Sequence, residues 1–223
     1  MVNRVAVIIG STGLIGNLLL EELIHSEKYS RIKSFVRQPT GIAADPKVEE
    51  YSVDFSDKDL IAQKLAGDDL FICVGTTIKK SGSVKKMEEI DRDLPIKIAA
   101  IASTNGVKRI AVVSSMGASP GSKNYYLRIK GEMEEGIKKL NFENIAIVRP
   151  SMLLGERNEK RTGEVVGKIV MKTFKPLLVG KLKKYRAIHG KDVARAMIDI
   201  LQKEYVKNVY ESDELQDIAG LYK

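Results

Sequence analysis

The strongest constraint on the fold lies near the start of the chain, where an apolar stretch from Val5 to Ile9 meets a glycine-rich segment from Gly10 to Gly16. The stretch is rich in β-branched residues and ends in glycine, which is typical of a buried strand. Ile15, Leu19 and Leu23 then recur four residues apart, as on one face of a helix. A strand, a glycine turn and a helix in this order predict the opening βαβ unit of a dinucleotide-binding fold.

Each glycine of this G-x-x-G-x-x-G pattern has its own expected function. Gly10 would let the chain turn sharply off the strand, Gly13 would let a pyrophosphate approach the backbone, and Gly16 would let the helix pack close to the sheet. The helix N-terminus offers free N–H groups and a positive dipole end to phosphates. A tight turn without a ligand is the alternative. The predicted phosphate-binding residues are Gly10, Ser11, Thr12, Gly13, Leu14, Ile15 and Gly16.

Apolar strands and amphipathic helices alternate along the rest of the chain. Strands are predicted at residues 31–36, 48–53, 69–74, 109–113, 145–148 and 206–210, and helices at 56–65, 91–104, 123–140, 192–203 and 213–221. Such alternation favours βαβ units and therefore a parallel sheet. We predict an α/β fold, a Rossmann-type doubly wound parallel sheet in a single domain of residues 1–223. Residues 79–86 read as a basic loop. Residues 152–186, with one helix at 163–173, are expected to form a small C-terminal region that covers the substrate side.

The cofactor preference is predicted from Arg37, which directly follows the strand at 31–36. In this type of fold the tip of that strand faces the adenosine ribose, where NAD-specific proteins usually carry Asp or Glu. An arginine can instead pair with the 2′-phosphate of NADP. We therefore predict NADP(H) rather than NAD(H) as the cofactor. A solvated arginine at a strand end is the alternative.

Two further strand ends contribute to the predicted cofactor site. Asp54 follows the strand at 48–53, where its carboxylate could contact the adenine edge or cap a turn, and both options stay open. Val74, Gly75 and Thr76 end the strand at 69–74. Small residues at this position would let the central ribose and the phosphates approach the backbone.

Ser115, Tyr126 and Lys130 carry the mechanistic argument. Tyr126 and Lys130 are four residues apart on a predicted helix and therefore project from one face, and Ser115 lies just beyond the strand at 109–113. Hydride transfer to a carbonyl needs a proton donor at the developing alkoxide. Tyrosine ionises near pH 10, and an ammonium beside a tyrosine favours the phenolate. Tyr126 would thus donate the proton, Lys130 would assist it and hold the nicotinamide ribose, and Ser115 would position the substrate oxygen.

Ser114 adjoins Ser115, and a strand that alternates its side chains would point only one of the two into the cleft. The sequence leaves open which serine this is, and we choose Ser115.

With these residues assembled, the chain resembles the short-chain dehydrogenase/reductase superfamily, in particular its atypical, extended-type members. It is similar to the group around the human Tat-interacting oxidoreductase, through Cys73 to Thr77, Asp91 to Asp93 and Tyr126 to Glu132. The resemblance covers nearly the whole chain. It implies an NAD(P)-binding Rossmann domain in which Arg149 and Pro150 also lie at the cofactor, and it implies no particular substrate. The short interval from Ser115 to Tyr126 departs from extended members and leaves less substrate-binding loop.

Two functional hypotheses follow. The first is an NADPH-dependent oxidoreductase that reduces a small carbonyl compound or another hydride acceptor. The second is a non-catalytic NADP(H)-binding regulator that senses the redox state of the pool. Intact side chains do not by themselves prove a productive substrate pose, so the sequence cannot separate the two. The expected partner is a small-molecule substrate, and a homodimer stays open.

Charge and composition restrict the other classes of function. The formal net charge is +8, but the lysines are spread along the chain without interleaved aromatic residues or a nucleic-acid-binding motif. We therefore expect no nucleic-acid partner. No apolar run approaches the length of a transmembrane helix, and the chain enters a strand without a signal peptide. With a single cysteine, these features lead us to expect a cytoplasmic protein that makes no membrane contact.

The single cysteine and the two histidines receive structural interpretations. Cys73 lies inside a predicted strand without a local base, so we expect a buried, inert thiol. His25 is expected on a helix surface, and the resemblance places His189 behind the cofactor site as a packing residue. Neither histidine has a partner at metal-ligand spacing, so we predict no metal site.

Overall fold

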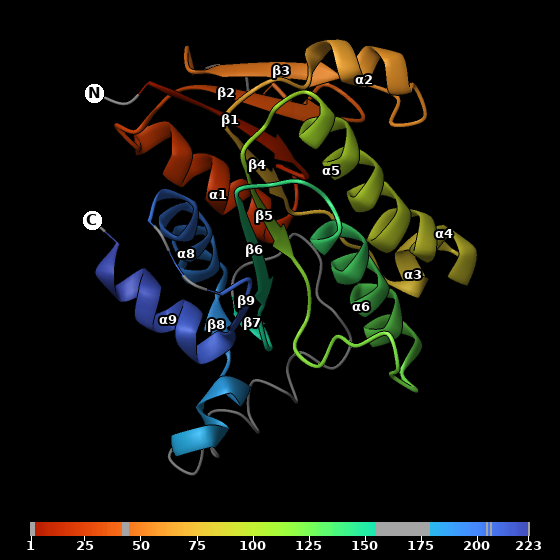
Figure 1. Ribbon diagram of the computed structural model, residues 1–223, viewed down its shortest axis with the longest axis vertical. Coiled ribbons are helices and arrows are strands. Elements are labelled where there is room, and N and C mark those ends of the chain that lie inside the picture. The colour runs from red at the N-terminus through yellow and green to blue at the C-terminus, as the bar shows by residue number, and fades with distance from the viewer. Residues whose placement is uncertain (1–2, 42–44, 155–178, 204, 206, 223) are drawn as a thin grey trace.

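A computed structural model describes residues 3–41, 45–154, 179–203, 205 and 207–222 (Figure 1). A seven-stranded sheet forms its centre, in the order β3-β2-β1-β4-β5-β6-β9 with every pairing parallel. Its strands are β1 Arg4–Ile9, β2 Tyr29–Val36, β3 Val48–Ser52, β4 Asp69–Ile72, β5 Arg109–Val113, β6 Asn144–Arg149 and β9 Val209–Glu211. The order reverses direction between β1 and β4, which confirms the predicted doubly wound Rossmann-type sheet.

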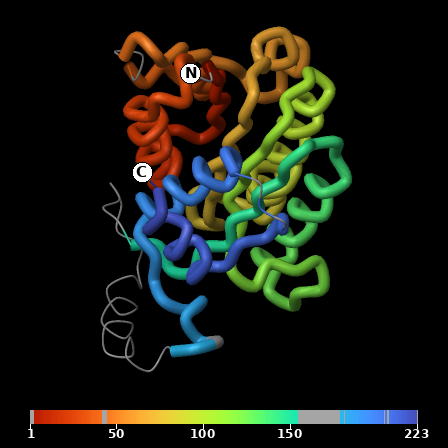
Figure 2. The backbone as a smooth tube through the Cα atoms, turned by 60° about the vertical axis from the view of Figure 1, so that its left-hand side comes forward, coloured from red at the N-terminus to blue at the C-terminus, as the bar shows by residue number. Residues whose placement is uncertain are grey.

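Helices cover both faces of the sheet (Figures 1 and 2). One face packs against α1 Leu14–His25, α8 Gly190–Gln202 and α9 Ser212–Leu221, and the other against α2 Lys58–Lys64, α5 Leu94–Thr104 and α6 Tyr125–Lys138. The alternation of β1 explains the two cores. Ala6 and Ile8 belong to the first core, whereas Val7 and Ile9 belong to the second, because successive side chains of a strand point to opposite faces. A strand buried on both sides is expected to be continuously apolar, as β1 is from Val5 to Ile9.

The segment after β4 differs from our prediction of a basic loop at residues 79–86. It forms two short helices, α3 Ile78–Ser81 and α4 Val84–Glu88. Their first turns are capped by hydroxyls, since Thr77 Oγ1 accepts from the Lys80 N–H at 3.3 Å and Ser83 Oγ accepts from the Lys86 N–H at 3.1 Å. The buried side chain of Met87 fixes α4 against the protein.

The helix predicted to begin near residue 91 begins earlier. A π-helical turn, η2 Glu89–Asp93, joins α4 directly to α5. Such turns insert an extra residue into a helix and are frequent at functional sites. This turn lies beside the end of β4.

Residues 152–186 are described only at their two ends. The strand β7 Leu153–Leu154 pairs in parallel with β8 Ile188–His189, and the 3-10 helix η4 Gly180–Tyr185 precedes β8. The predicted helix at 163–173 lies outside the described residues. Among the described residues, no helix is long and apolar enough to span a membrane.

Candidate functional site

A cavity of about 800 Å³ opens at the carboxyl end of the sheet, where the strand order reverses. This is the location at which open α/β sheets bind their ligands, and the volume suits a cofactor with a small substrate. Segments that follow β1, β4, β5 and β6 form the wall together with α6. The described lining residues are Gly13, Leu14, Ile15, Cys73, Val74, Gly75, Thr76, Thr77, Ile78, Lys79, Met87, Val113, Ser114, Ser115, Tyr126, Lys130, Pro150, Ser151, Met152 and Leu153.

The three glycines of the turn after β1 have different surroundings. Gly10 has φ of +92°, which favours glycine, and a Cβ there would lie 2.9 Å from the Cys73 carbonyl carbon. A Cβ at Gly16 would lie 2.0 Å from the Gly10 carbonyl oxygen. Gly13 lines the cavity, and its Cβ would meet nothing nearer than 3.4 Å. Gly10 and Gly16 therefore serve backbone packing, whereas Gly13 leaves space in the cavity.

This difference predicts that one substitution lowers cofactor affinity and another lowers the stability of the fold. Gly13→Val should keep the fold and lower NADPH affinity at least about tenfold, because its side chain would occupy the cavity beside α1. Gly16→Ala should destabilise the fold by roughly 3 kcal/mol, since a methyl group cannot fit against the Gly10 carbonyl. Thermal unfolding and titration of NADPH fluorescence measure the two effects. Unchanged affinity in a folded Gly13→Val variant would contradict a phosphate site at this turn.

The turn is tied to the end of β2 through two buried hydroxyls. Ser34 Oγ donates to Ser11 Oγ at 2.8 Å. Ser11 thus lies under the turn rather than in the cavity wall, and Thr12 is exposed beside it. Arg37, three residues beyond Ser34, is exposed and forms no ion pair with another described residue. The guanidinium is therefore unpaired within the described part of the chain, and Arg37 does not line the described cavity.

Asp54 caps a turn. Its Oδ1 accepts from the Ser56 N–H at 2.8 Å, and this hydrogen bond lowers the pKa of the Asp54 carboxyl. The structure thus shows one of the two options that the sequence left open. Asp54 is exposed and does not line the described cavity.

At the end of β5 the two serines have separate roles. The buried Ser114 Oγ donates to Glu134 Oε1 at 2.5 Å. Ser114 and Ser115 both line the cavity, but among the described residues no hydrogen bond engages the Ser115 hydroxyl. The hydroxyl of Ser114 therefore anchors α6, and that of Ser115 is free to meet a substrate.

Arg149 also binds Glu134 of α6. Its Nε and Nη2 donate to the two oxygens of Glu134 at 2.9 and 2.6 Å, and its Nη1 lies 3.5 Å from Glu211 Oε1. The guanidinium neutralises a carboxylate that is only 1% exposed, which explains why it turns away from the cavity. Of the pair implied by the resemblance, Pro150 lines the cavity and Arg149 does not.

Tyr126 and Lys130 project from the first two turns of α6 into the cavity. The helix begins there because Asn124 Oδ1 accepts from the Leu127 N–H at 3.2 Å, which makes Asn124 the N-cap. Lys130 is 2% exposed, and its Nζ lies 3.4 Å from the Val113 carbonyl oxygen, which accepts from it. The structure thus brings Ser115, Tyr126 and Lys130 together at one cavity, the arrangement that the sequence predicted.

The sequence reasoning missed Asp91, the residue that holds Lys130. Asp91 is fully buried on η2, with Oδ1 2.9 Å from Lys130 Nζ and Oδ2 accepting from the Thr76 N–H at 2.9 Å. The contact with Lys130 is an ion pair that lacks hydrogen-bond geometry at Oδ1. One carboxylate therefore joins the loop after β4 to the lysine of α6. A signal existed: Asp91 falls on the same helical face as Leu94 and Ile98, and a carboxylate on an apolar face needs a partner.

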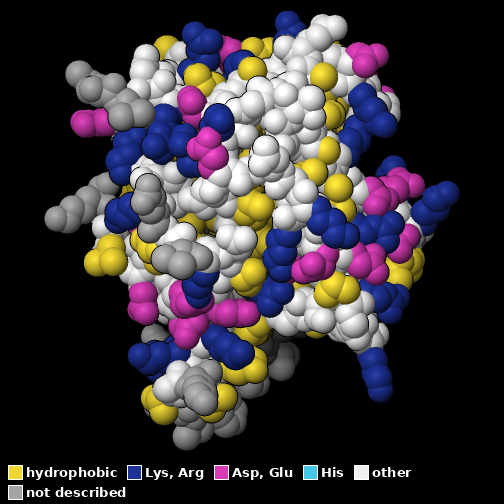
Figure 3. Space-filling model, in the orientation of Figure 1, with side chains coloured by type: hydrophobic (Ala, Val, Ile, Leu, Met, Phe, Trp, Pro, Cys, Tyr) yellow, Lys and Arg dark blue, Asp and Glu magenta, His cyan; other side chains and the backbone are white. Residues whose placement is uncertain are grey.

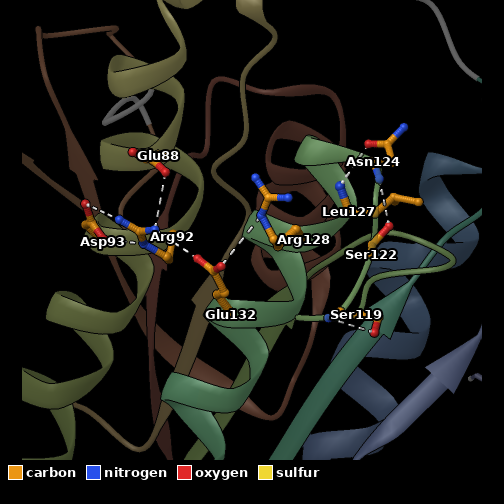
Figure 4. A network of polar contacts seen from close by, with 10 residues as sticks. Glu88, Arg92, Asp93, Ser119, Ser122, Asn124, Leu127, Arg128 and Glu132 are labelled. Atoms are coloured by element: carbon orange, nitrogen blue, oxygen red, sulfur yellow. Dashed lines mark hydrogen bonds and ion pairs between the residues drawn. The ribbon is translucent and has the colours of Figure 1, made fainter.

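A surface network supports this contact from outside (Figure 4). Arg92, the neighbour of Asp91, donates through Nη1 to Glu132 Oε2 on α6 at 2.9 Å and through Nε to Asp93 at 2.7 Å. Nη1 also lies 3.4 Å from Glu88 Oε1. Successive residues of η2 thus bind α6 on its buried and exposed sides, which fixes Asp91 relative to Lys130.

We assign no chemical role to the cysteine or to either histidine. Cys73 is half-buried in the cavity wall, and burial raises the pKa of its thiol to about 12, so the thiol stays protonated at neutral pH. His25 is exposed on α1, with Nδ1 2.7 Å from the Glu21 carbonyl oxygen. The expectation that His189 packs behind the cofactor site is wrong, because His189 is exposed at the start of α8.

Comparisons with known proteins agree with this geometry. A family model described as NAD(P)H-binding matches residues 10–204. Protein HTATIP2 of Rattus norvegicus is 34% identical over 167 residues, covering 74% of this chain and 69% of the relative. Protein FMP52, mitochondrial, of Candida glabrata is 37% identical over 166 residues, covering 73% and 70%. The structure of the Bordetella bronchiseptica enzyme WbmG in complex with NAD superposes with a TM-score of 0.68 at 14% identity, covering 99% of this chain and 78% of WbmG.

One of these findings corrects an expectation. The names of the FMP52 relatives from three fungi contain the word mitochondrial. They contradict our prediction of a cytoplasmic protein, which relied on the lack of a recognisable signal and on cysteine content. Neither property fixes a compartment, because targeting is read by receptors and not by the physics of the folded domain.

Proposed function

Because the chain belongs to the NAD(P)H-binding family, we propose that it is an NADPH-dependent oxidoreductase of the atypical short-chain dehydrogenase/reductase type, which reduces a small carbonyl compound or another hydride acceptor. The observation that carries the proposal is the convergence of Ser115, Tyr126 and Lys130 on one cavity beside the glycine turn. Ser115 follows β5, Tyr126 and Lys130 lie on α6, and the glycine turn belongs to the other half of the sheet.

The cavity suits a dinucleotide. Gly13, Leu14 and Ile15 would hold the pyrophosphate at the N-terminus of α1, where no side chain of Gly13 obstructs the approach. The loop formed by Val74, Gly75 and Thr76 would lie along the central ribose, and Pro150 would face the nicotinamide end. When bound, the reduced cofactor supplies a hydride to the substrate.

The residues of this chain would perform the remaining steps. The Tyr126 hydroxyl would donate a proton to the substrate oxygen, and the Ser115 hydroxyl would hydrogen-bond the same oxygen and fix its position. Lys130 would donate to the ribose hydroxyls and place a positive charge near the tyrosine. All three residues line the same cavity, and the proposal places the carbonyl oxygen of the substrate between the Ser115 and Tyr126 hydroxyls.

Asp91 acts in this scheme as a positioning residue. Its carboxylate fixes the ammonium of Lys130 from the side of β4, and its second oxygen fixes the Thr76 N–H of the cofactor loop. A buried lysine without a counter-ion would be strongly disfavoured. Asp91 therefore supplies the counter-charge for a lysine that is only 2% exposed.

The proposal is tested by NADPH binding and oxidation. The purified protein is titrated into NADPH and then screened with aldehydes, ketones, quinones and flavins, with absorbance at the reduced nicotinamide band as readout. Turnover of a carbonyl compound is the expected result. Tight NADPH binding without turnover of any acceptor would instead support the non-catalytic NADP(H)-sensing regulator.

Arg37 predicts the cofactor preference. Its exposed guanidinium, which follows the end of β2, should make NADPH bind more tightly than NADH by about 1–3 kcal/mol, the range for hydrogen bonds between charged groups. Arg37→Ala should remove most of that difference. Arg31→Ala is the matched control, because Arg31 lies on β2, the strand that Arg37 follows, and pairs with Glu49 at 3.1 Å. Equal affinities of the unmutated protein for the two cofactors would contradict the NADP(H) assignment.

A further inference from the structure

We propose that the substrate of this site is an apolar carbonyl compound that carries an anionic group, and that Lys79 binds this group. The proposal rests on the oxidoreductase function proposed above and specifies the class of its substrate. It is carried by the charges and the apolar side chains of the cavity wall.

The side chains that line the described part of the cavity carry a net positive charge. Two lining side chains are charged, Lys79 and Lys130. The charge of Lys130 is balanced by Asp91 at 2.9 Å. Lys79 is exposed and forms no ion pair with any other described residue, and no carboxylate belongs to the described wall. Among the described lining residues, Lys79 is thus the one whose positive charge is not balanced and can bind an anionic ligand.

Lys79 lies on a fixed element. It belongs to α3, whose first turn is closed by the Ser81 N–H donating to the Thr77 carbonyl oxygen at 2.8 Å and by the hydroxyl cap of Thr77. Thr77 and Ile78 line the same cavity and directly follow the loop after β4. The backbone that carries Lys79 is therefore a hydrogen-bonded helical turn that directly follows the cavity-lining loop.

The rest of this part of the wall is apolar. Ile78 follows β4 and Met152 follows β6, and both line the cavity, yet these residues are 53% and 36% exposed. Met87 and Leu153 continue the apolar wall inward. Exposed large apolar side chains that border a cavity indicate a ligand that covers them. An apolar body with a negative group fits Ile78, Met152 and Lys79 together.

The surface around this position is not uniformly basic. Figure 3 shows basic and acidic side chains side by side over the edge that α3, α4 and α6 form in Figure 1. Lys86, for example, pairs with Glu89 at 2.9 Å. A general basic patch therefore does not explain the position of Lys79 in the cavity wall. The same chemistry could also serve a phosphate of the cofactor, and the experiment separates the two sources.

The test compares 4-carboxybenzaldehyde with methyl 4-formylbenzoate, which share a ring and an aldehyde and differ in charge. In NADPH oxidation we expect kcat/KM to be about tenfold higher for the carboxylate, with the advantage shrinking as salt rises. Lys79→Gln should lower the carboxylate to the level of the ester and leave the ester unchanged. Lys85→Gln is the matched control, because Lys85 is exposed on the adjacent α4 and does not line the described cavity.

Three outcomes would overturn the inference. The first is equal kcat/KM for the two aldehydes, and the second is an advantage for the carboxylate that survives Lys79→Gln. The third is a loss of NADPH affinity in Lys79→Gln without a change in substrate preference, which would assign Lys79 to a cofactor phosphate.

A binding measurement keeps the inference distinct from the proposed function. If neither aldehyde is reduced, both are titrated into the NADPH-loaded protein with the fluorescence of bound NADPH as readout. Tighter binding of the carboxylate that depends on Lys79 would support the anion site while the reductase proposal fails. Absence of that difference would overturn the anion site as well.

Discussion

Replacing Tyr126 with phenylalanine should lower turnover of a carbonyl substrate by about 10²–10⁴-fold, the usual contribution of one general acid. The substitution removes a single hydroxyl and keeps the ring that forms part of the cavity wall. The affinity for NADPH should stay nearly unchanged, because Lys130 and the glycine turn are untouched. Steady-state kinetics with the best substrate of the screen and NADPH fluorescence measure the two quantities.

Tyr125 provides the matched control for this experiment. It precedes Tyr126 on α6, does not line the described cavity, and its ring lies 4.9 Å from the Arg128 guanidinium. Tyr125→Phe should therefore keep full activity. An activity that is indifferent to Tyr126→Phe would mean that protonation comes from elsewhere, as with a flavin or quinone acceptor.

The second large effect is expected at Asp91. Asp91→Asn keeps an acceptor for the Thr76 N–H but removes the charge beside Lys130, and it should destabilise the fold by about 3–5 kcal/mol, the cost of breaking a buried ion pair. For a chain of this size each kcal/mol corresponds to roughly 2–4 °C in Tm. Turnover and NADPH affinity should both fall at temperatures where the variant is folded, since Lys130 loses its fixed position.

A double-mutant cycle separates this pair from a general loss of packing. Lys130→Met should cost less stability in the Asp91→Asn background than in the unmutated protein, because no unpaired charge remains. Asp93→Asn is the control on the same π-helical turn, where Asp93 is exposed and pairs with Arg92. Additive effects of Asp91→Asn and Lys130→Met would contradict the coupling that the 2.9 Å contact implies.

The sequence by itself determined the framework. The apolar run before Gly10 and the helical period after Gly16 defined β1 and α1, because burial on two faces requires a continuous apolar strand. The alternation of further strands and helices left a doubly wound parallel sheet as the expected fold. Tyr126 and Lys130 could be assigned to one face because a helix places residues four apart side by side, and the end of a parallel strand placed Ser115 at the same edge.

Only the tertiary structure decided which polar groups are free. The Ser114 hydroxyl and the Arg149 guanidinium are both bound to Glu134, whereas the Ser115 hydroxyl at the cavity has no hydrogen-bond partner among the described residues. Asp91, on the π-helical turn η2, contacts Lys130 of α6, an ion pair across 39 residues whose partners no local pattern identifies. Local periodicity sets the direction of a side chain relative to its own helix or strand. Its partners depend on how distant elements pack, and in this protein that packing selects the chemically available side chains.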